Sequence, residues 1–91
     1  MNPKEKTQAI RERLTAVLSP YRLQIEDQSH LHAGHNPAAQ HGGTHYAVTI
    51  VSDQFAGKRS IERHRMVYDA LGSLMNSIHA LAITAKTPDE P

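Results

Sequence analysis

The sequence contains no cysteine and no tryptophan among its 91 residues, and its aromatic residues are three tyrosines and one phenylalanine. The lack of cysteine excludes a disulfide framework, a thiolate nucleophile and an iron–sulfur site built from the chain's own thiolates. With so few aromatic residues, the core should be mostly aliphatic. No apolar run approaches the ~20 residues that cross a bilayer, and the opening MNPKEKTQAIRERL lacks the apolar segment of a secretory signal. We therefore expect a cytoplasmic protein that does not enter a membrane.

A strong charge of either sign is also missing. The chain has 10 basic and 9 acidic residues, which gives a net charge of +1 with histidine neutral. This balance argues against tight binding of nucleic acid by charge alone, although a local basic patch remains open. The length suits one domain with one modest core, which we place over 1–91 with frayed ends at 1–3 and 87–91. We expect a monomer or a weak homodimer.

Histidine is the residue that the chain has in excess. Of seven histidines, five fall in the segment HLHAGHNPAAQHGGTH, which covers residues 30–45. Glycine and proline recur through this segment and interrupt regular structure. We therefore predict a histidine-rich loop over 29–44.

Helix signals are clear in the first part of the chain. Asn2 and Glu5 have the spacing of a capping box, and Pro3 suits a first helical position. Ile10 and Leu14 then lie on one apolar face, and a proline at position 20 ends the pattern. These features predict a helix over 3–18.

The remaining elements follow from alternation and from helical spacing. Apolar and polar residues alternate over 21–26, which predicts a strand with one face in solvent. The segment 46–51 is apolar on both faces, which predicts a central strand. A second helix should begin at a Ser60 cap and bend or divide at Gly72. Its apolar stripe follows the helical spacing of Ile61, His64, Tyr68, Leu71, Met75 and Ile78. The apolar segment HALAITAK, residues 79–86, predicts a third strand.

The resulting order is α-β-β-α-(α)-β. The first two strands should pair antiparallel across the histidine-rich loop. The third strand follows a helix, so a right-handed crossover should place it parallel to a neighbour. The predicted fold class is α+β, a three-stranded mixed sheet with the helices packed on one face.

Nearly the whole chain resembles the BolA family. The resemblance lies in a loop that contains histidine, THY at the start of a strand, VSDQFAG, RHRMVY, and IHAL followed by TP, in that order. It implies a KH-like fold of the second topological type, which agrees with the element order. It also implies an adaptor or regulator rather than an enzyme, and the sequence contains no catalytic motif.

The histidines are candidate metal ligands, because neutral imidazole binds zinc, copper, nickel and iron. His32 and His35 lie close together in the loop, but no carboxylate accompanies them, so a closed zinc site within this chain is not expected. His79 should lie at a sheet end near the loop. One loop histidine and His79 would form a half-filled site whose other ligands come from another molecule. Capture of nickel, copper or zinc by the loop alone is the alternative without a partner.

The resemblance gives this half-filled site a function. BolA-like proteins pair with monothiol glutaredoxins and share a [2Fe–2S] cluster, for which the partner supplies a cysteine and a bound glutathione. His79 matches the histidine of the family's HAL motif. His32 is the best match to the loop ligand by its offset from DQS, and His35 is the second choice. The implied role is iron–sulfur assembly or trafficking and iron or stress regulation.

The other histidines have simpler interpretations. We expect His30 and His41 to face solvent. His45, at the start of the second strand, should be structural and bond across the loop. His64 should be a half-buried structural residue with one hydrogen bond.

A basic cluster supports an alternative function. Lys58, Arg59, Arg63 and Arg65 gather around the start of the second helix, where a helix N-terminus also favours phosphate. Bacterial members of the family are described as transcriptional regulators, and the region around the second helix and the strand that follows it is proposed to meet DNA. The comparable turn GKRS lacks the second glycine of a KH-type GXXG loop, which weakens an RNA-binding interpretation. The alternative is therefore a DNA-binding regulator.

Overall fold

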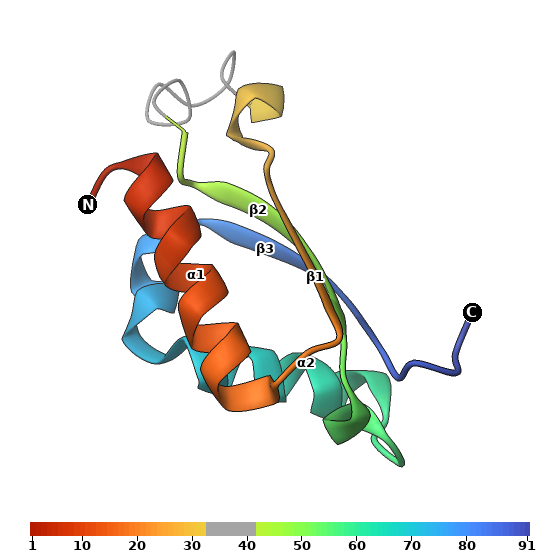
Figure 1. Ribbon diagram of the computed structural model, residues 1–91. Coiled ribbons are helices and arrows are strands. Elements are labelled where there is room, and N and C mark those ends of the chain that lie inside the picture. Colours follow the sequence, from red (N-terminus) through yellow and green to blue (C-terminus); the bar gives the residue numbers. More distant parts are fainter. Residues whose placement is uncertain (33–41) are drawn as a thin grey trace.

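The computed structural model describes residues 1–32 and 42–91 of the protein (Figure 1). The helices and strands of this part, in chain order, are α1 (Pro3–Leu18), β1 (Arg22–Asp27), η1 (Ser29–His32), β2 (His45–Val51), η3 (Asp53–Phe55), α2 (Ser60–Leu71), η4 (Gly72–Ser77) and β3 (Ala80–Lys86). The η elements are short 3-10 helices. None of the helices in the described ranges is long and apolar enough to cross a membrane.

Helix α1 forms where the sequence predicts it. The Asn2 side chain accepts from the Glu5 backbone N–H, and the Glu5 carboxylate accepts from the Asn2 backbone N–H, which completes the capping box. The helix ends at Leu18, and the Ser19 that caps it adopts a left-handed conformation with φ 44°. Its buried residues, Ile10 and Leu14 among them, form one face that packs into the core. Burial of a side chain of this size contributes about 1.5–3 kcal/mol.

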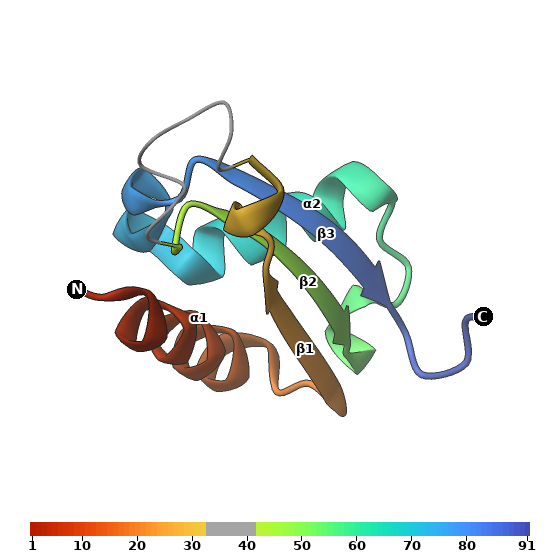
Figure 2. The same ribbon diagram turned by 90° about the horizontal axis from the view of Figure 1, so that it is seen from above.

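The sheet has the order β1-β2-β3. Strands β1 and β2 pair antiparallel, and β3 pairs parallel to β2 with His45 opposite Ala80. Tyr46, Val48 and Ile50 of β2 are buried, and their neighbours in sequence are only partly buried. The strand pairing and the central place of β2 confirm the predictions. Figures 1 and 2 show both helices on the same side of the sheet, as the α+β prediction requires.

Helix α2 buries only part of the predicted apolar stripe, because its later member Leu71 is buried and its earlier members are exposed or half-buried. Its buried residues are Val67, Ala70 and Leu71, whereas Ile61 and Tyr68 are 58% and 41% exposed. The helix has apolar residues on more than one side, and the position of the sheet decides which side is covered. The predicted Ser60 cap is also wrong by one residue. The cap is Arg59, which makes no capping hydrogen bond through its side chain.

The break after α2 is where the sequence places it. Gly72 has φ 56°, a left-handed value that costs glycine little. The chain continues as η4, so the expected division of this helical region is confirmed. The turn brings the chain back to the start of β3 at the end of the sheet where β2 also starts.

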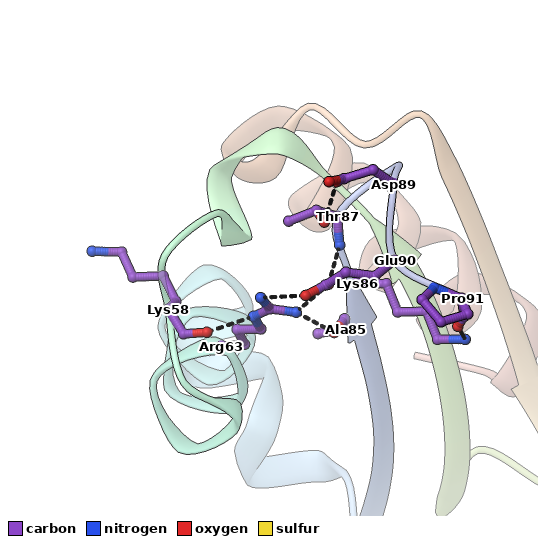
Figure 3. A network of polar contacts seen from close by, with 8 residues as sticks. All are labelled: Lys58, Arg63, Ala85, Lys86, Thr87, Asp89, Glu90 and Pro91. Carbon is purple, nitrogen blue, oxygen red and sulfur yellow. Dashed lines mark hydrogen bonds and ion pairs between the residues drawn. The ribbon is translucent and has the colours of Figure 1, made fainter.

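The segment after β3 is held against the molecule, although the sequence suggests a frayed end. Thr87 is buried, and its backbone N–H donates to the Glu90 carboxylate at 2.7 Å. The Thr87 hydroxyl donates to Asp89 at 2.7 Å. Arg63 of α2 forms two hydrogen bonds to the Glu90 carboxylate, at 2.6 and 3.0 Å (Figure 3). These contacts connect residues 87–90 to α2.

Candidate functional site

The candidate site lies at the end of the sheet where the histidine-rich loop joins it. At this end β1 finishes with Asp27, and β2 begins with His45. Strand β3 runs parallel to β2, so it begins at the same end with Ala80, and His79 directly precedes it. Figure 1 shows η1 and the starts of β2 and β3 together at this end.

His79 meets the loop stem through its backbone and its ring. Its backbone N–H donates to the Thr44 carbonyl at 2.7 Å, and the Ala80 N–H donates to the same carbonyl at 3.1 Å. The His79 ring stacks on the His45 ring, with centroids 5.1 Å apart and planes inclined by 25°. His79 is exposed, so its ring is accessible from outside the molecule. Two imidazoles from distant parts of the sequence therefore lie side by side.

A compact set of polar residues holds both ends of the loop. We call this set the stem clamp, and it consists of Asp27, Ser29, Gly43 and Thr44. The Asp27 carboxylate accepts from the Ser29 hydroxyl at 2.6 Å, from the Ser29 N–H at 3.0 Å and from the Gly43 N–H at 2.8 Å. The Ser29 oxygen accepts from the backbone N–H groups of Thr44 and His45, at 3.0 and 3.1 Å. The clamp therefore joins the end of β1 to the start of β2.

The hydrogen bonds also set the charge state of the clamp. Burial raises the pKa of Asp27, but the hydrogen bonds from Ser29 and Gly43 outweigh it and lower the pKa below the ordinary aspartate value. Asp27 is therefore an ionised acceptor at neutral pH. A charged acceptor makes the bonds at the loop stem stronger than bonds between neutral groups.

A lysine from α1 completes the connection between the loop stem and η4. The Lys6 ammonium donates to the Gly43 carbonyl at 2.7 Å and to the Ser77 carbonyl at 2.8 Å. Gly42 and Gly43 both have positive φ, and a Cβ at Gly42 would lie 3.0 Å from an Asp27 carboxylate oxygen. Side chains other than hydrogen would be strained there. The two glycines thus permit the approach of the loop to the clamp.

The other predicted site residues have varied positions. His32 ends η1, so its backbone lies at the same end of the sheet as His79. His35 and His41 lie outside the described residues. His30 is exposed on η1, and His64 is half-buried on α2. In the described part of the chain, no three His, Asp or Glu side chains gather in a way that could hold a metal ion.

The predicted basic cluster is divided by the structure. The Arg63 guanidinium donates to the carbonyls of Lys58 and Ala85 as well as to Glu90, and its side chain is only 13% exposed (Figure 3). Arg59 pairs with Glu62 at 2.7 Å on the surface. Lys58 and Arg65 are exposed, and they line a shallow hollow of about 270 Å³ that also contains Glu62 and Asp69. Arg63 is therefore a partly buried cation whose guanidinium donates to acceptors of the protein itself.

Sequence reasoning missed the stack of His45 on His79 and the stem clamp. It treated His45 as a structural residue that bonds across the loop, and its N–H does bond to Ser29 across the stem. The signal that could have revealed the contact between His45 and His79 was the predicted parallel pairing of the second and third strands. If β3 lies parallel to β2 and both begin at one end, then the residues that open the two strands must be neighbours.

Comparison with known proteins agrees with this architecture. A family model described as BolA-like protein matches residues 14–90. The chain is 48% identical over 86 residues to SufE-like protein 1, chloroplastic/mitochondrial, of Arabidopsis thaliana, a match that spans 89% of this chain and 23% of that protein. It is 39% identical over 82 residues to the DNA-binding transcriptional regulator BolA of Escherichia coli (strain K12), a match that spans 89% of this chain and 74% of that protein.

A solved structure gives the same result for the fold. The BolA domain of SufE1 from Arabidopsis thaliana superposes with a TM-score of 0.81 at 46% sequence identity, and the match covers 94% of this chain and 95% of that domain. The family model extends from α1 to the segment after β3. The chain therefore belongs to the BolA-like protein family.

Proposed function

We propose that the chain is an adaptor that docks a monothiol glutaredoxin and shares a [2Fe–2S] cluster with it through histidines, in iron–sulfur assembly or trafficking and in iron or stress regulation. One observation supports this role most directly. The exposed His79 is tied to the stem of the histidine-rich loop by the 2.7 Å hydrogen bond to Thr44, and its ring stacks on His45. Imidazoles from two separate segments therefore meet at one accessible place.

The donor set fits a shared cluster. A [2Fe–2S] cluster takes four ligands, and histidine replaces cysteine on one iron in Rieske centres. The chain has no cysteine, so any thiolate ligands must come from another molecule. A monothiol glutaredoxin that carries glutathione offers two thiol groups. In this role the cluster is cargo that the two proteins hold jointly.

The proposed roles of individual residues are supported by their places in the fold. His79 is one proposed ligand, because it is exposed beside the loop stem. His32 is the first choice for the loop ligand because its backbone reaches the same end of the sheet, and His35 remains the alternative. The stem clamp and Lys6 keep both ends of the loop close to His79.

Spectroscopy of the mixed proteins tests the proposal. Addition of the chain to cluster-loaded monothiol glutaredoxin should change the visible absorption and circular dichroism, because imidazole replaces one of the original ligands. The variant His79→Ala should abolish this change. His64→Ala is the matched control, since it removes a half-buried histidine from α2 and should leave the spectral change intact.

Two results would contradict the proposal. If the native chain leaves the spectrum of the loaded glutaredoxin unchanged, cluster sharing is wrong. If His79→Ala gives the same change as the native chain, His79 is not a ligand. Substitution of His32 and His35, one at a time, then identifies the loop ligand.

A DNA-binding regulator is the second candidate function. It is favoured by the similarity to the Escherichia coli protein named as a DNA-binding transcriptional regulator. The surface offered for it is smaller than the sequence suggests, because Arg63 is held by Glu90 and Arg59 by Glu62. Lys58 and Arg65 would carry most of the phosphate contacts, and the acidic residues in the hollow between them oppose binding.

A further inference from the structure

The ring of His45 is held on two sides. One ring face stacks on His79, with the centroids 5.1 Å apart. Its Nδ1 atom lies 2.8 Å from the Thr44 hydroxyl, which is hydrogen-bond distance. The backbone N–H of His45 donates to the Ser29 hydroxyl oxygen at 3.1 Å. Main chain and ring are therefore both fixed at the start of β2.

The contact at Nδ1 is the end of a continuous hydrogen-bonded chain. The Thr44 hydroxyl donates to the Ser29 oxygen at 3.1 Å, and the Ser29 hydroxyl donates to the Asp27 carboxylate at 2.6 Å. Asp27 is ionised at neutral pH, and the Ser29 residue is 1% exposed. The series of hydrogen bonds thus connects the Asp27 carboxylate, through the hydroxyls of Ser29 and Thr44, to the His45 imidazole. We call it the Asp27–His45 relay.

The environment of His79 is different. Its backbone is fixed by the hydrogen bond to the Thr44 carbonyl, but its side chain is exposed. An exposed imidazole samples several staggered rotamers, and coordination of a metal must then select one of these rotamers. The stack on His45 is a contact that restricts the His79 ring. The fixed His45 ring therefore limits the orientations that the exposed His79 ring can adopt.

We propose that His45 is a positioning residue for His79. The Asp27–His45 relay holds the His45 ring, and the stack holds the His79 ring in one orientation before any cluster is bound. The functional part of this inference rests on the proposed role of His79 as a cluster ligand. Residues that orient a metal-binding histidine commonly change affinity by about 10–100-fold when they are substituted.

The first experiment needs no cluster and no partner. The side-chain rotamers of His79 are measured by NMR coupling constants in the isolated protein and in three variants. The native chain should show one dominant rotamer, and His45→Ala should show rotamer averaging. Thr44→Val keeps the β-branched shape but removes the hydroxyl, so it should loosen His79 in part. Thr44→Ser keeps the hydroxyl, so this variant should show the same His79 rotamer as the native protein.

The second experiment measures how the variants take part in cluster sharing. Cluster-loaded monothiol glutaredoxin is titrated with each protein and followed by visible circular dichroism. His45→Ala should reach the native endpoint spectrum with a midpoint shifted about tenfold to higher concentration. Thr44→Val should shift the midpoint less, and Thr44→Ser should match the native chain. His30→Ala, which removes an exposed histidine from η1, is the control.

The outcomes separate the two proposals. An unchanged His79 rotamer in His45→Ala overturns the positioning role, whatever the cluster does. A rotamer change without a shift of the titration midpoint overturns its functional part. A changed endpoint spectrum in His45→Ala makes His45 a ligand, which also contradicts a positioning role. If the native chain shows no spectral change, the proposed function fails, while the NMR comparison still decides the positioning role.

Discussion

The guanidinium of Arg63 is held by acceptors of the protein itself. It binds the Glu90 carboxylate through two hydrogen bonds and donates to the carbonyls of Lys58 and Ala85 (Figure 3). A planar guanidinium suits this arrangement, because it presents several donors in fixed directions. Lysine could not replace it without losing contacts. Arg63, which the sequence offers as a candidate DNA contact, therefore also attaches residues 87–90 to α2.

The Arg63–Glu90 pair gives a prediction about pH. The Arg63 hydrogen bond and then the Thr87 backbone N–H lower the pKa of Glu90 from 4.5 to about 2. Because the folded-state pKa is lowered, the attachment of residues 87–90 should be complete above pH 4.5 and should weaken as the pH falls toward 2. The chemical shift of the Thr87 amide proton, followed by NMR against pH, should report this midpoint.

Glu90→Gln is the matched variant for that titration. It keeps the size of the side chain but removes the charge, so the Thr87 amide should lose its low-pH transition. A native transition near pH 4.5 would show that Arg63 does not hold the carboxylate in solution.

At the scale of elements, the stem clamp fixes how η1 and β2 meet. Ser29 is the centre of the clamp, since it is 1% exposed and its oxygen accepts from two backbone N–H groups. A turn alone would supply no side-chain acceptor for these part-buried donors. The clamp therefore explains how a segment rich in glycine and histidine joins the sheet at a defined point.

Removal of the Ser29 hydroxyl should destabilise the protein. Ser29→Ala removes the acceptor of the part-buried Thr44 and His45 N–H groups, and loss of a buried hydrogen-bond partner costs about 1–3 kcal/mol. Urea denaturation should show a loss of that size in the free energy of unfolding. Ser73→Ala, on the exposed surface of η4, is the control and should change it by less than about 0.5 kcal/mol. Equal effects of the two substitutions would contradict the role of the clamp.

At the scale of the whole molecule, three distant segments converge on one end of the sheet. Lys6 from α1 binds the carbonyls of Gly43 and Ser77, and Thr44 binds the backbone of His79. The parallel pairing of β2 with β3 makes this convergence possible, because both strands start at the same end. His79 and the residues that hold it therefore lie together, away from the Arg63–Glu90 pair at the end of β3.

The overall charge gives a prediction for the second candidate function. With a net charge of +1, DNA binding has to depend on local cations, and the structure leaves Lys58 and Arg65 exposed for it. We expect any duplex binding to weaken with salt, and Lys58→Ala with Arg65→Ala to reduce the log–log salt slope by about two. Fluorescence anisotropy over a range of salt concentrations measures the slope.

The charge-matched control for that measurement is on α1. Lys4→Ala with Arg11→Ala removes two exposed cations far from α2 in the sequence and should preserve the slope. Equal slopes for the native chain and the Lys58/Arg65 variant would exclude this surface from DNA binding.

Local sequence determined most of the secondary structure. The capping box at Asn2 set the start of α1, alternation set the strands, and Gly72 divided the second helical region. These signals act between residues a few positions apart, so they can be recognised in the linear chain. The concentration of histidine also marked the segment beside which the candidate site lies.

Only the tertiary structure decided which side chains meet. The pairing of His45 with His79, the bond of Arg63 to Glu90 and the buried face of α2 all depend on how the helices and strands pack. In the sequence Arg63 lies among other basic residues, whereas in the folded protein it lies beside the Glu90 carboxylate. Such contacts follow from strand register and crossover geometry, which join residues that share no local pattern.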